Sequence, residues 1–265
     1  MSNWIDLIVT FSQKLDKTMS AVDLVDLLTN AKSISMEMPF RFSCWLCGRL
    51  CCTSTVDILI LPNEKIRINN DLKKKNRKHI FLDDYPNHQP FKIEIDQFAM
   101  TTAIFINPIP DPENGQPLCP FFCLSSRPGD VYGGCGVYDN RPHTCRCYPL
   151  GNFIRSAYGY MEQKYVFMPA SCPGFQGACS EQTVGEYLDK NQSPNMDMEF
   201  SLFYKYLYPK ICNLVDIGGE QVSRMIGEWL FQIPGPDRIL SETELHEFIL
   251  SGYARIEKEM DKLMK

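Results

Sequence analysis

Four cysteines within nine residues mark the segment Cys44-Trp45-Leu46-Cys47-Gly48-Arg49-Leu50-Cys51-Cys52, which decides what kind of core this chain is expected to build. A C-x2-C turn can aim two thiolates at one ion because the backbone between them folds into a knuckle. Gly48 suits the positive φ that such a turn often needs. Cys51 and Cys52 are adjacent, so in extended backbone they serve different sites, or one binds metal while the other packs. The segment therefore predicts a thiolate-bound metal centre.

The second half of the cysteine pattern lies much further along the chain. It consists of Cys119-Pro120-Phe121-Phe122, Gly134-Cys135-Gly136, Arg141-Pro142-His143-Thr144-Cys145-Arg146-Cys147 and Cys172-Pro173-Gly174. Prolines after Cys119 and Cys172 remove a backbone donor and fix the exit from each expected ligand. The glycines around Cys135 allow close backbone approach to a bulky inorganic site.

The composition is that of an ordinary globular protein. Among 265 residues, 27 are basic and 32 acidic, giving a net charge of −5, and 44% are hydrophobic. This mild acidity gives no reason to expect nucleic acid as a partner. The first residues lack the order of a secretory signal, and no apolar run is long enough for a membrane span. We therefore expect a reducing cytoplasm, where the 12 cysteines indicate metal ligands or redox groups.

Hydrophobic periodicity divides the chain into three parts. Residues 1–40 predict a helical segment, residues 41–180 a cysteine-cluster metal-binding domain, and residues 181–265 a helical region packed on the core. Strands are expected at 56–60, 92–96, 103–106 and 158–168, and helices at 183–191, 200–214, 222–229 and 241–264, the last opened by a capping box of Ser241 and Glu244. The predicted fold class is α+β, with an irregular cysteine-rich core flanked by helices.

These motifs resemble the CxxCxxCC cysteine-cluster family, also called YkgJ-like, which is described as zinc- or iron-chelating and includes the flagellin lysine N-methylases. The family pattern includes Cys-Pro-Phe, Arg-Pro-x-x-Cys-Arg and a late Cys-x-Gly, and the resemblance covers roughly residues 40–180. It implies eight metal ligands, which are Cys44, Cys47, Cys51, Cys52, Cys119, Cys135, Cys145 and Cys172.

The sequence also departs from the family pattern. One extra residue separates Cys47 from Cys51, so the first knuckle cannot be copied atom for atom. Cys123, Cys147 and Cys179 lie outside the pattern but near the cluster, and they are further ligand candidates. Cys212 follows an apolar residue on an expected amphipathic helix, which predicts a buried thiol.

The number and setting of the thiolates favour iron–sulfur clusters. Eight thiolates exceed the four that a tetrahedral zinc ion takes, and the second half lacks the C-x2-C of a zinc ribbon. Iron–sulfur clusters take four cysteines each from irregular loops, so eight suit two clusters, which we expect to be of the 4Fe-4S type. Zinc or mononuclear iron is one alternative, and redox disulfides or free thiols are another.

Two arginines are expected beside this centre. Arg141 and Arg146 can offset its negative charge through hydrogen bonds to sulfur, whereas the alternative is an arginine–carboxylate pair that holds the loop. His143 between them is interpreted as an outer or solvated residue and not as a ligand.

Four functions stay open at this point. The first two are an electron-transfer component and a metal- or cluster-handling factor, each acting on a protein partner that is an electron donor, an acceptor or a client. A protein-lysine N-methyltransferase is suggested only by the resemblance, and a structural zinc-binding interaction protein is the fourth. The sequence contains no G-x-G-x-x-G after a strand and nominates no catalytic acid or base.

Overall fold

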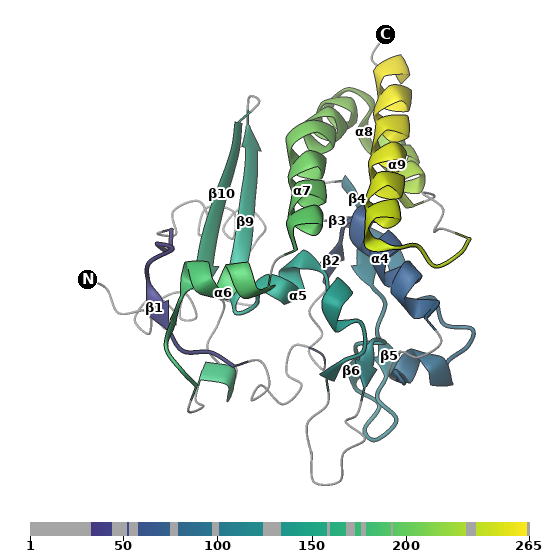
Figure 1. Ribbon diagram of the computed structural model, residues 1–265. Coiled ribbons are helices and arrows are strands. Elements are labelled where there is room, and N and C mark those ends of the chain that lie inside the picture. The colour runs from purple at the N-terminus through teal and green to yellow at the C-terminus, as the bar shows by residue number, and fades with distance from the viewer. Residues whose placement is uncertain are drawn as a thin grey trace.

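The computed structural model describes residues 33–43, 52, 58–74, 79–96, 101–123, 134–157, 160–167, 173–175, 179–191, 193–231 and 237–263. These residues combine helices with short antiparallel strands, so the predicted α+β class is confirmed. In Figure 1 the helices α7 (Pro194–Leu202), α8 (Tyr208–Phe231) and α9 (Glu242–Leu263) stand together, and a long two-stranded ribbon rises nearby. The helices expected before residue 33 lie outside the described residues.

A three-stranded antiparallel sheet has the order β2 (Leu59–Ile60), β4 (Thr101–Ile106), β3 (Phe91–Asp96). The strands expected at 92–96 and 103–106 are therefore confirmed, and the strand expected at 56–60 is confirmed at residues 59–60, whereas residues 56–57 lie outside the described residues. Because side chains alternate along a strand, Ile104 and Ile106 share one face of β4, and both are buried. Helix α8 packs against β4 and covers this sheet.

The long ribbon pairs β9 (Leu150–Ala157) with β10 (Tyr160–Phe167). At its base Leu150 faces Phe167, and both side chains are buried. Strand β10 confirms the strand expected at 158–168, whereas the periodicity does not predict β9.

Three further strand pairs are only two residues long. They are β1 (Pro39–Phe40) with β11 (Gln182–Thr183), β5 (Ile109–Pro110) with β6 (Pro117–Leu118), and β7 (Phe122–Cys123) with β8 (Gly134–Cys135). Short 3-10 turns lie between them at η2 (Phe81–Asp84), η3 (Tyr138–Asn140) and η4 (Pro173–Phe175). Cys119, Cys123 and Cys135 thus lie in or directly after very short strands.

The helical part of the chain surrounds one apolar core. It contains α4 (Pro62–Leu72), α7, the π-helical turn η5 (Phe203–Leu207), α8 and α9. Helix α9 starts at the predicted capping box, where Ser241 N donates to Glu244 Oε2 at 2.9 Å. Helix α8 contains a kink at Gly219, whose φ of +59° belongs to the left-handed region that favours glycine.

Helix α4 is not predicted by the sequence, because the face that it buries is largely polar. Asn63, Glu64 and Arg67 are all at most 2% exposed. The Arg67 guanidinium donates to both oxygens of Glu199 on α7, at 2.8 and 2.5 Å, and to Glu242 on α9. This ionic network joins three helices in the core.

A second core joins segments that are far apart in the sequence. Ile34 and Phe40 pack with Phe167 of the ribbon and with Val184 and Tyr187 of α6 (Val184–Asn191). Helix α6 confirms the helix expected at 183–191. The sheet and the β7–β8 pair form a third core. Each of these cores therefore draws on more than one stretch of the chain.

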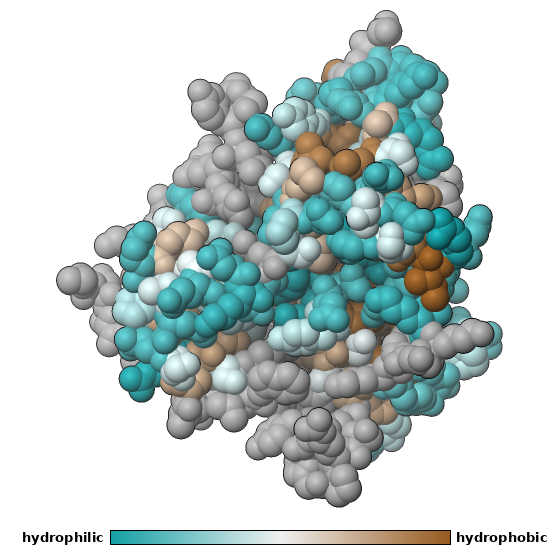
Figure 2. Space-filling model, in the orientation of Figure 1, coloured by the Kyte–Doolittle hydropathy of each residue, from teal (hydrophilic) through white to brown (hydrophobic). Residues whose placement is uncertain are grey.

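The described surface is mainly hydrophilic on the face that Figure 2 shows, and hydrophobic side chains come to the surface there chiefly over the helices α7 to α9. Tyr206 and Ile217 are among the exposed apolar residues of this part. None of the described helices is both long enough and apolar enough to cross a membrane.

Candidate metal centre

Half of the predicted ligand set can be placed. Cys52, Cys119, Cys135 and Cys145 are described, and each is half-buried. Cys44, Cys47, Cys51 and Cys172 lie outside the described residues. The additional candidates Cys123 and Cys147 are buried, whereas Cys179 and Cys212 are half-buried. The cysteines of the family pattern that can be placed are therefore all partly accessible.

The first group of motif cysteines surrounds the β7–β8 pair. The backbone N–H of Cys119 donates to the carbonyl of Cys52 at 2.7 Å, although the two are far apart in the sequence. Phe122 N donates to Cys119 O at 3.0 Å, and Phe122 pairs across the strands with Cys135. Backbone bonds thus link the segments of three predicted ligands.

Cys123 has a different environment within this group. It is 3% exposed, packs in the core under the sheet, and its thiol donates to the carbonyl of Gly134 at 3.3 Å. A buried thiol with its own acceptor is typical of a core residue. Of the two glycines beside Cys135, Gly136 serves the protein core, since a Cβ there would clash with Ile80 Cγ2.

The second group is organised by the short helix α5 (His143–Cys147), which carries Cys145 and Cys147. A cis peptide bond between Tyr148 and Pro149 follows the helix directly. The hydroxyl of Tyr187 on α6 donates to the carbonyl of Tyr148. The end of α5 is therefore held against α6.

Residues that flank two undescribed ligands meet near α5. Ser43 N donates to the carbonyl of Gly174 at 3.0 Å. The ring of Phe42 packs on the rings of Phe175 and Tyr148, with centroids 5.1 and 6.0 Å apart, respectively. A Cβ on Gly174 would lie 2.9 Å from the Ser43 carbonyl, so this close approach requires glycine. The late Cys-x-Gly of the motif thus has a packing reason for its glycine.

His143, Cys147 and Asn152 form a buried constellation. His143 Nε2 lies 3.2 Å from Cys147 Sγ and 2.7 Å from Asn152 Nδ2. The imidazole ring stacks on the ring of Phe200, and the two ring centroids are 3.9 Å apart. Burial lowers the pKa of His143 to about 3, and the Arg146 charge adds to this. Burial raises the pKa of Cys147 to about 12. His143 is therefore a neutral residue 5% exposed, not a solvated one.

These residue types are those of a cysteine–histidine–asparagine catalytic set, but their state is wrong for one. A nucleophilic cysteine needs a lowered pKa and access to substrate. Cys147 is only 1% exposed, and burial holds its thiol in the protonated form. The constellation is therefore a hydrogen-bonded part of the core.

Glu64 fastens α5 to the helical core. It accepts hydrogen bonds from Leu61 N at 2.8 Å and from His143 N, the first amide of α5. Burial raises the pKa of Glu64 to about 7, against the opposing effect of these two amides. No local sequence pattern marks Glu64 as a functional residue, because its partner on α5 is a tertiary contact.

The two predicted arginines have different surroundings. Arg141 donates to Tyr138 O at 3.0 Å and to Asn191 Oδ1 at 3.2 Å, and its guanidinium lies 3.6 Å from the centre of the Tyr138 ring. Arg146 is 3% exposed, and Nη1 lies 3.6 Å from Asp197 Oδ1 on α7. Burial raises the pKa of Asp197, and Arg146 opposes this.

The described residues alone do not complete a metal site. No group of three or more histidine, cysteine, aspartate or glutamate side chains among them is arranged to hold a metal ion. The donor types nevertheless suit soft metals, since thiolates select zinc, copper(I) and iron–sulfur clusters. Arg146, the residue after Cys145 on α5, has two buried side-chain nitrogens without a hydrogen-bonded acceptor, and the nearest carboxylate is Asp197 at 3.6 Å.

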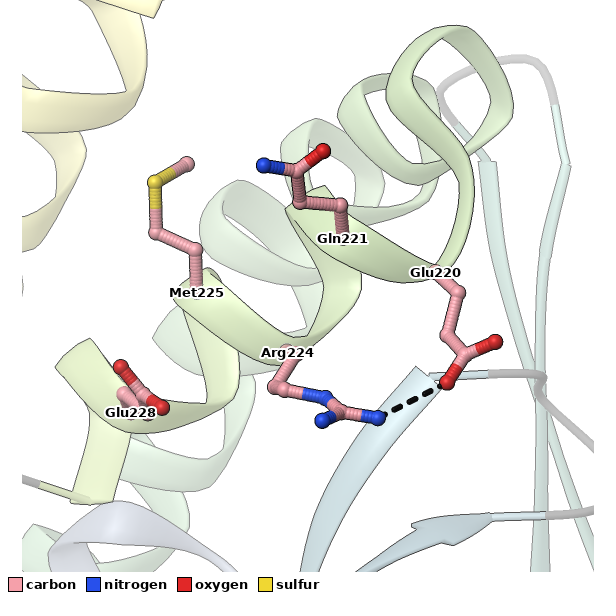
Figure 3. A pocket seen from close by; sticks show the side chains of 5 residues that line it. All are labelled: Glu220, Gln221, Arg224, Met225 and Glu228. Carbon is pink, nitrogen blue, oxygen red and sulfur yellow. Dashed lines mark hydrogen bonds and ion pairs between the residues drawn. The ribbon is translucent and has the colours of Figure 1, made fainter.

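A separate hollow on α8 contains none of this chemistry. It is lined by Glu220, Gln221, Arg224, Met225 and Glu228, and Figure 3 shows all five side chains extending from the same helix. Arg224 pairs with Glu220 at 2.9 Å, so its charge is already balanced. The hollow offers no thiol or imidazole.

Comparison with known proteins identifies no relative. No family model matches the chain, and neither a curated protein nor a solved structure is significantly similar to it.

Proposed function

We propose that this protein binds iron–sulfur clusters through its motif cysteines and acts as a redox component or a cluster-handling factor for a protein partner. One observation carries the proposal: motif segments that are distant in sequence are hydrogen-bonded in pairs, Cys52 with Cys119 and Ser43 with Gly174. A chain that gathers thiol-bearing segments into irregular turns provides the setting that iron–sulfur clusters use.

The exposure of the cysteines supports the same proposal. The four motif cysteines that are described are half-buried, whereas Cys123 and Cys147 are in the core. A thiol must reach its metal and lose its proton, and deep burial without the metal opposes both. We therefore assign Cys123 and Cys147 to packing in the proposed arrangement.

The described ligands favour two sites. Cys52, Cys119 and Cys135 belong to the β7–β8 neighbourhood, and Cys145 belongs to α5, whose residues pack in a different core. Eight predicted ligands, of which the four described lie in two neighbourhoods, suit two four-cysteine clusters. When bound, such a cluster supplies a one-electron redox group. A reducing compartment such as the cytoplasm would keep the ligand thiols available.

Metal analysis of anaerobically purified protein tests this proposal. We expect brown protein that contains iron and acid-labile sulfide, and visible absorption that dithionite bleaches reversibly. Colourless protein with stoichiometric zinc and no sulfide would contradict the proposal and support a zinc-binding interaction protein. Bound S-adenosylmethionine would instead favour a methyltransferase.

A matched pair of variants on one helix sharpens the test. Cys145→Ala should remove most of one cluster, because a ligand is lost. Cys147→Ala should keep the metal and lower the free energy of unfolding by about 1–3 kcal/mol, because it only removes a buried group. Cys212→Ala is a second control on α8. Equal loss of iron from Cys145→Ala and Cys147→Ala would contradict the assignment.

A further inference from the structure

Two described cysteines that are far apart in the sequence have adjacent backbones. The N–H of Cys119 donates to the carbonyl oxygen of Cys52 at 2.7 Å. Standard bond lengths on either side of this hydrogen bond place the two Cα atoms at most about 6.6 Å apart. Disulfides usually span Cα separations of about 4.4–6.8 Å. The two backbones are therefore close enough for a disulfide between Cys52 and Cys119.

The side chains of the same two cysteines reach one apolar cluster. The cluster consists of Ile109, Leu118 and Phe122, which are buried, and both Cys52 and Cys119 pack against it. Two cysteines whose Cβ atoms point apart cannot be bridged without movement of the backbone. Because both side chains pack on the same three residues, they are directed toward a common region.

The neighbouring cysteines are placed less directly. Cys52 and Cys119 are half-buried with free thiols, whereas Cys123 is buried and its thiol donates to a backbone carbonyl. Cys135 packs against the adjoining core that Cys119 also contacts, and its strand partner Phe122 is bonded to the Cys119 carbonyl. Among the described cysteines, Cys52 is thus the one bonded directly to the backbone of Cys119, and Cys135 is its competitor.

We propose that Cys52 and Cys119 form a reversible disulfide in the metal-free protein, and that this disulfide withholds both residues from the metal centre until it is reduced. The first part stands on the juxtaposition of the two residues, whereas the second rests on the proposed function and deepens it. Disulfides in reducing compartments are usually transient and redox-sensing, which agrees with a bond that regulates metal loading.

The oxidant is a low-molecular-weight disulfide of the glutathione class. The thiolate of one cysteine attacks a sulfur of this disulfide, which forms a mixed disulfide and releases one glutathione thiolate. The thiolate of the second cysteine then displaces the other glutathione from the protein sulfur. Two protein thiols are thereby oxidised by two electrons, the small disulfide is reduced to two thiols, and the two protein protons pass through solvent to the released thiolates.

Peptide mapping of the oxidised full-length protein tests the first part. Protein freed of metal by reduction and chelation is equilibrated with oxidised glutathione, alkylated and digested without reduction. We expect the main crosslink to join Cys52 to Cys119 and to disappear with dithiothreitol. In concentrated urea this preference should be lost, because unfolded chains favour pairs separated by short loops, such as Cys44 and Cys47.

Serine variants identify the residues that form the crosslink. Cys52→Ser and Cys119→Ser should each abolish it, whereas Cys51→Ser and Cys135→Ser are the matched controls that should retain it. A main crosslink between Cys119 and another cysteine, no crosslink, or the same crosslink yield in urea would overturn the inference.

Reconstitution with iron and sulfide tests the second part. Iron uptake should fall in proportion to the crosslinked fraction, by up to about half if one of two clusters is blocked, and dithiothreitol should restore it. Uptake that is independent of the crosslink would overturn the withholding of ligands. Reduced protein that binds neither iron nor sulfide would overturn the proposed function and the second part with it, whereas the crosslink would still support the first part.

Discussion

Two buried arginines show how differently the two halves of the molecule are organised. Arg67 in the helical half is 1% exposed and donates to Glu199 and Glu242, while Asn63 and His246 also bond to Glu199. Arg146 in the cysteine-rich half is equally buried, yet two of its nitrogens have no acceptor. The helical half thus satisfies the charge of its buried arginine with two carboxylates, whereas the buried arginine of the other half has one carboxylate at 3.6 Å.

The acids of α7 make the same contrast over a short distance. Glu199 is fully buried and accepts from the bidentate guanidinium of Arg67 at 2.5 and 2.8 Å. Asp197, on the same helix, approaches Arg146 only to 3.6 Å. On α7, Glu199 is therefore fully hydrogen-bonded to its arginine, whereas Asp197 and its arginine are too far apart for a hydrogen bond of normal length.

The largest expected effect is the loss of Arg67. Arg67→Met leaves Glu199 buried without its guanidinium partner, which should lower the free energy of unfolding by about 3–5 kcal/mol. Arg146→Met in metal-free protein should change it by no more than about 1 kcal/mol, because two nitrogens of Arg146 lack a hydrogen-bonded acceptor and its ion-pair partner Asp197 is 31% exposed. Urea unfolding followed by circular dichroism measures both. A loss for Arg146→Met as large as that for Arg67→Met would remove the contrast.

The next effect is the pH dependence of the free energy of unfolding, which depends on Glu64 and His143 where α4 contacts α5. The pKa of Glu64 rises from 4.5 to about 7 in the folded state, so stability falls as pH rises through that window. The pKa of His143 falls from 6.5 to about 3, so stability rises as pH rises through that window. From 4.5 to 6.5 the two contributions oppose each other and nearly cancel.

Replacing His143 should make the pH dependence of stability that Glu64 contributes directly measurable. In His143→Gln we expect the free energy of unfolding to fall by about 1.4 kcal/mol for each pH unit between pH 4.5 and 7, the change for one proton. Denaturant unfolding at half-unit pH steps, with wild type in parallel, checks this. A profile as flat as that of wild type would show that Glu64 does not retain its proton in the folded state.

A smaller effect is expected from the close contact in the motif region. Gly174→Ala places a methyl group 2.5 Å from the Phe42 ring and 2.9 Å from the Ser43 carbonyl, and overpacking of this kind typically costs about 1–3 kcal/mol. Gly134→Ala is the matched control, because its Cβ would meet no atom within 4 Å. Thermal unfolding of the two variants should differ clearly. Similar midpoints would mean that the segments of Phe42 and Gly174 separate easily.

The sequence predicted the elements whose stability comes from apolar periodicity. In β4 the buried Ile104 and Ile106 alternate with the half-buried Ala103 and Phe105, and α9 combines a capping box with apolar residues at helical spacing. Helix α4 was missed because Asn63, Glu64 and Arg67 occupy its buried face, so no apolar stripe marks it. Strand β9 was missed because Gly151 and Asn152 interrupt its alternation.

Of the candidate site, only the segments that carry the motif cysteines could be predicted from the sequence. Cysteine spacing selected the motif segments, and the pairing of Cys52 with Cys119 brings two of them together. The contacts of Glu64 with α5 and of Asp197 with Arg146 join residues from separate elements, and no local pattern encodes them. The ligand roles of the motif cysteines stay a prediction.

The smallest effect is expected at an exposed ion pair of the helical half, which tests whether burial or the number of charges sets the contrast. Lys210 on α8 bonds to Glu257 at 2.7 Å and to Asp261 at 2.9 Å on α9, so it has two carboxylate partners, as Arg67 does. Its side chain is 28% exposed and its partners more so, hence water and salt screen the attraction. Lys210→Met should therefore lower the free energy of unfolding by at most about 1 kcal/mol, and by less in 1 M salt. Urea unfolding at low and high salt measures this. A loss of several kcal/mol, independent of salt, would mean that charge pairing between helices matters whatever its burial, and the special position of Arg67 would disappear.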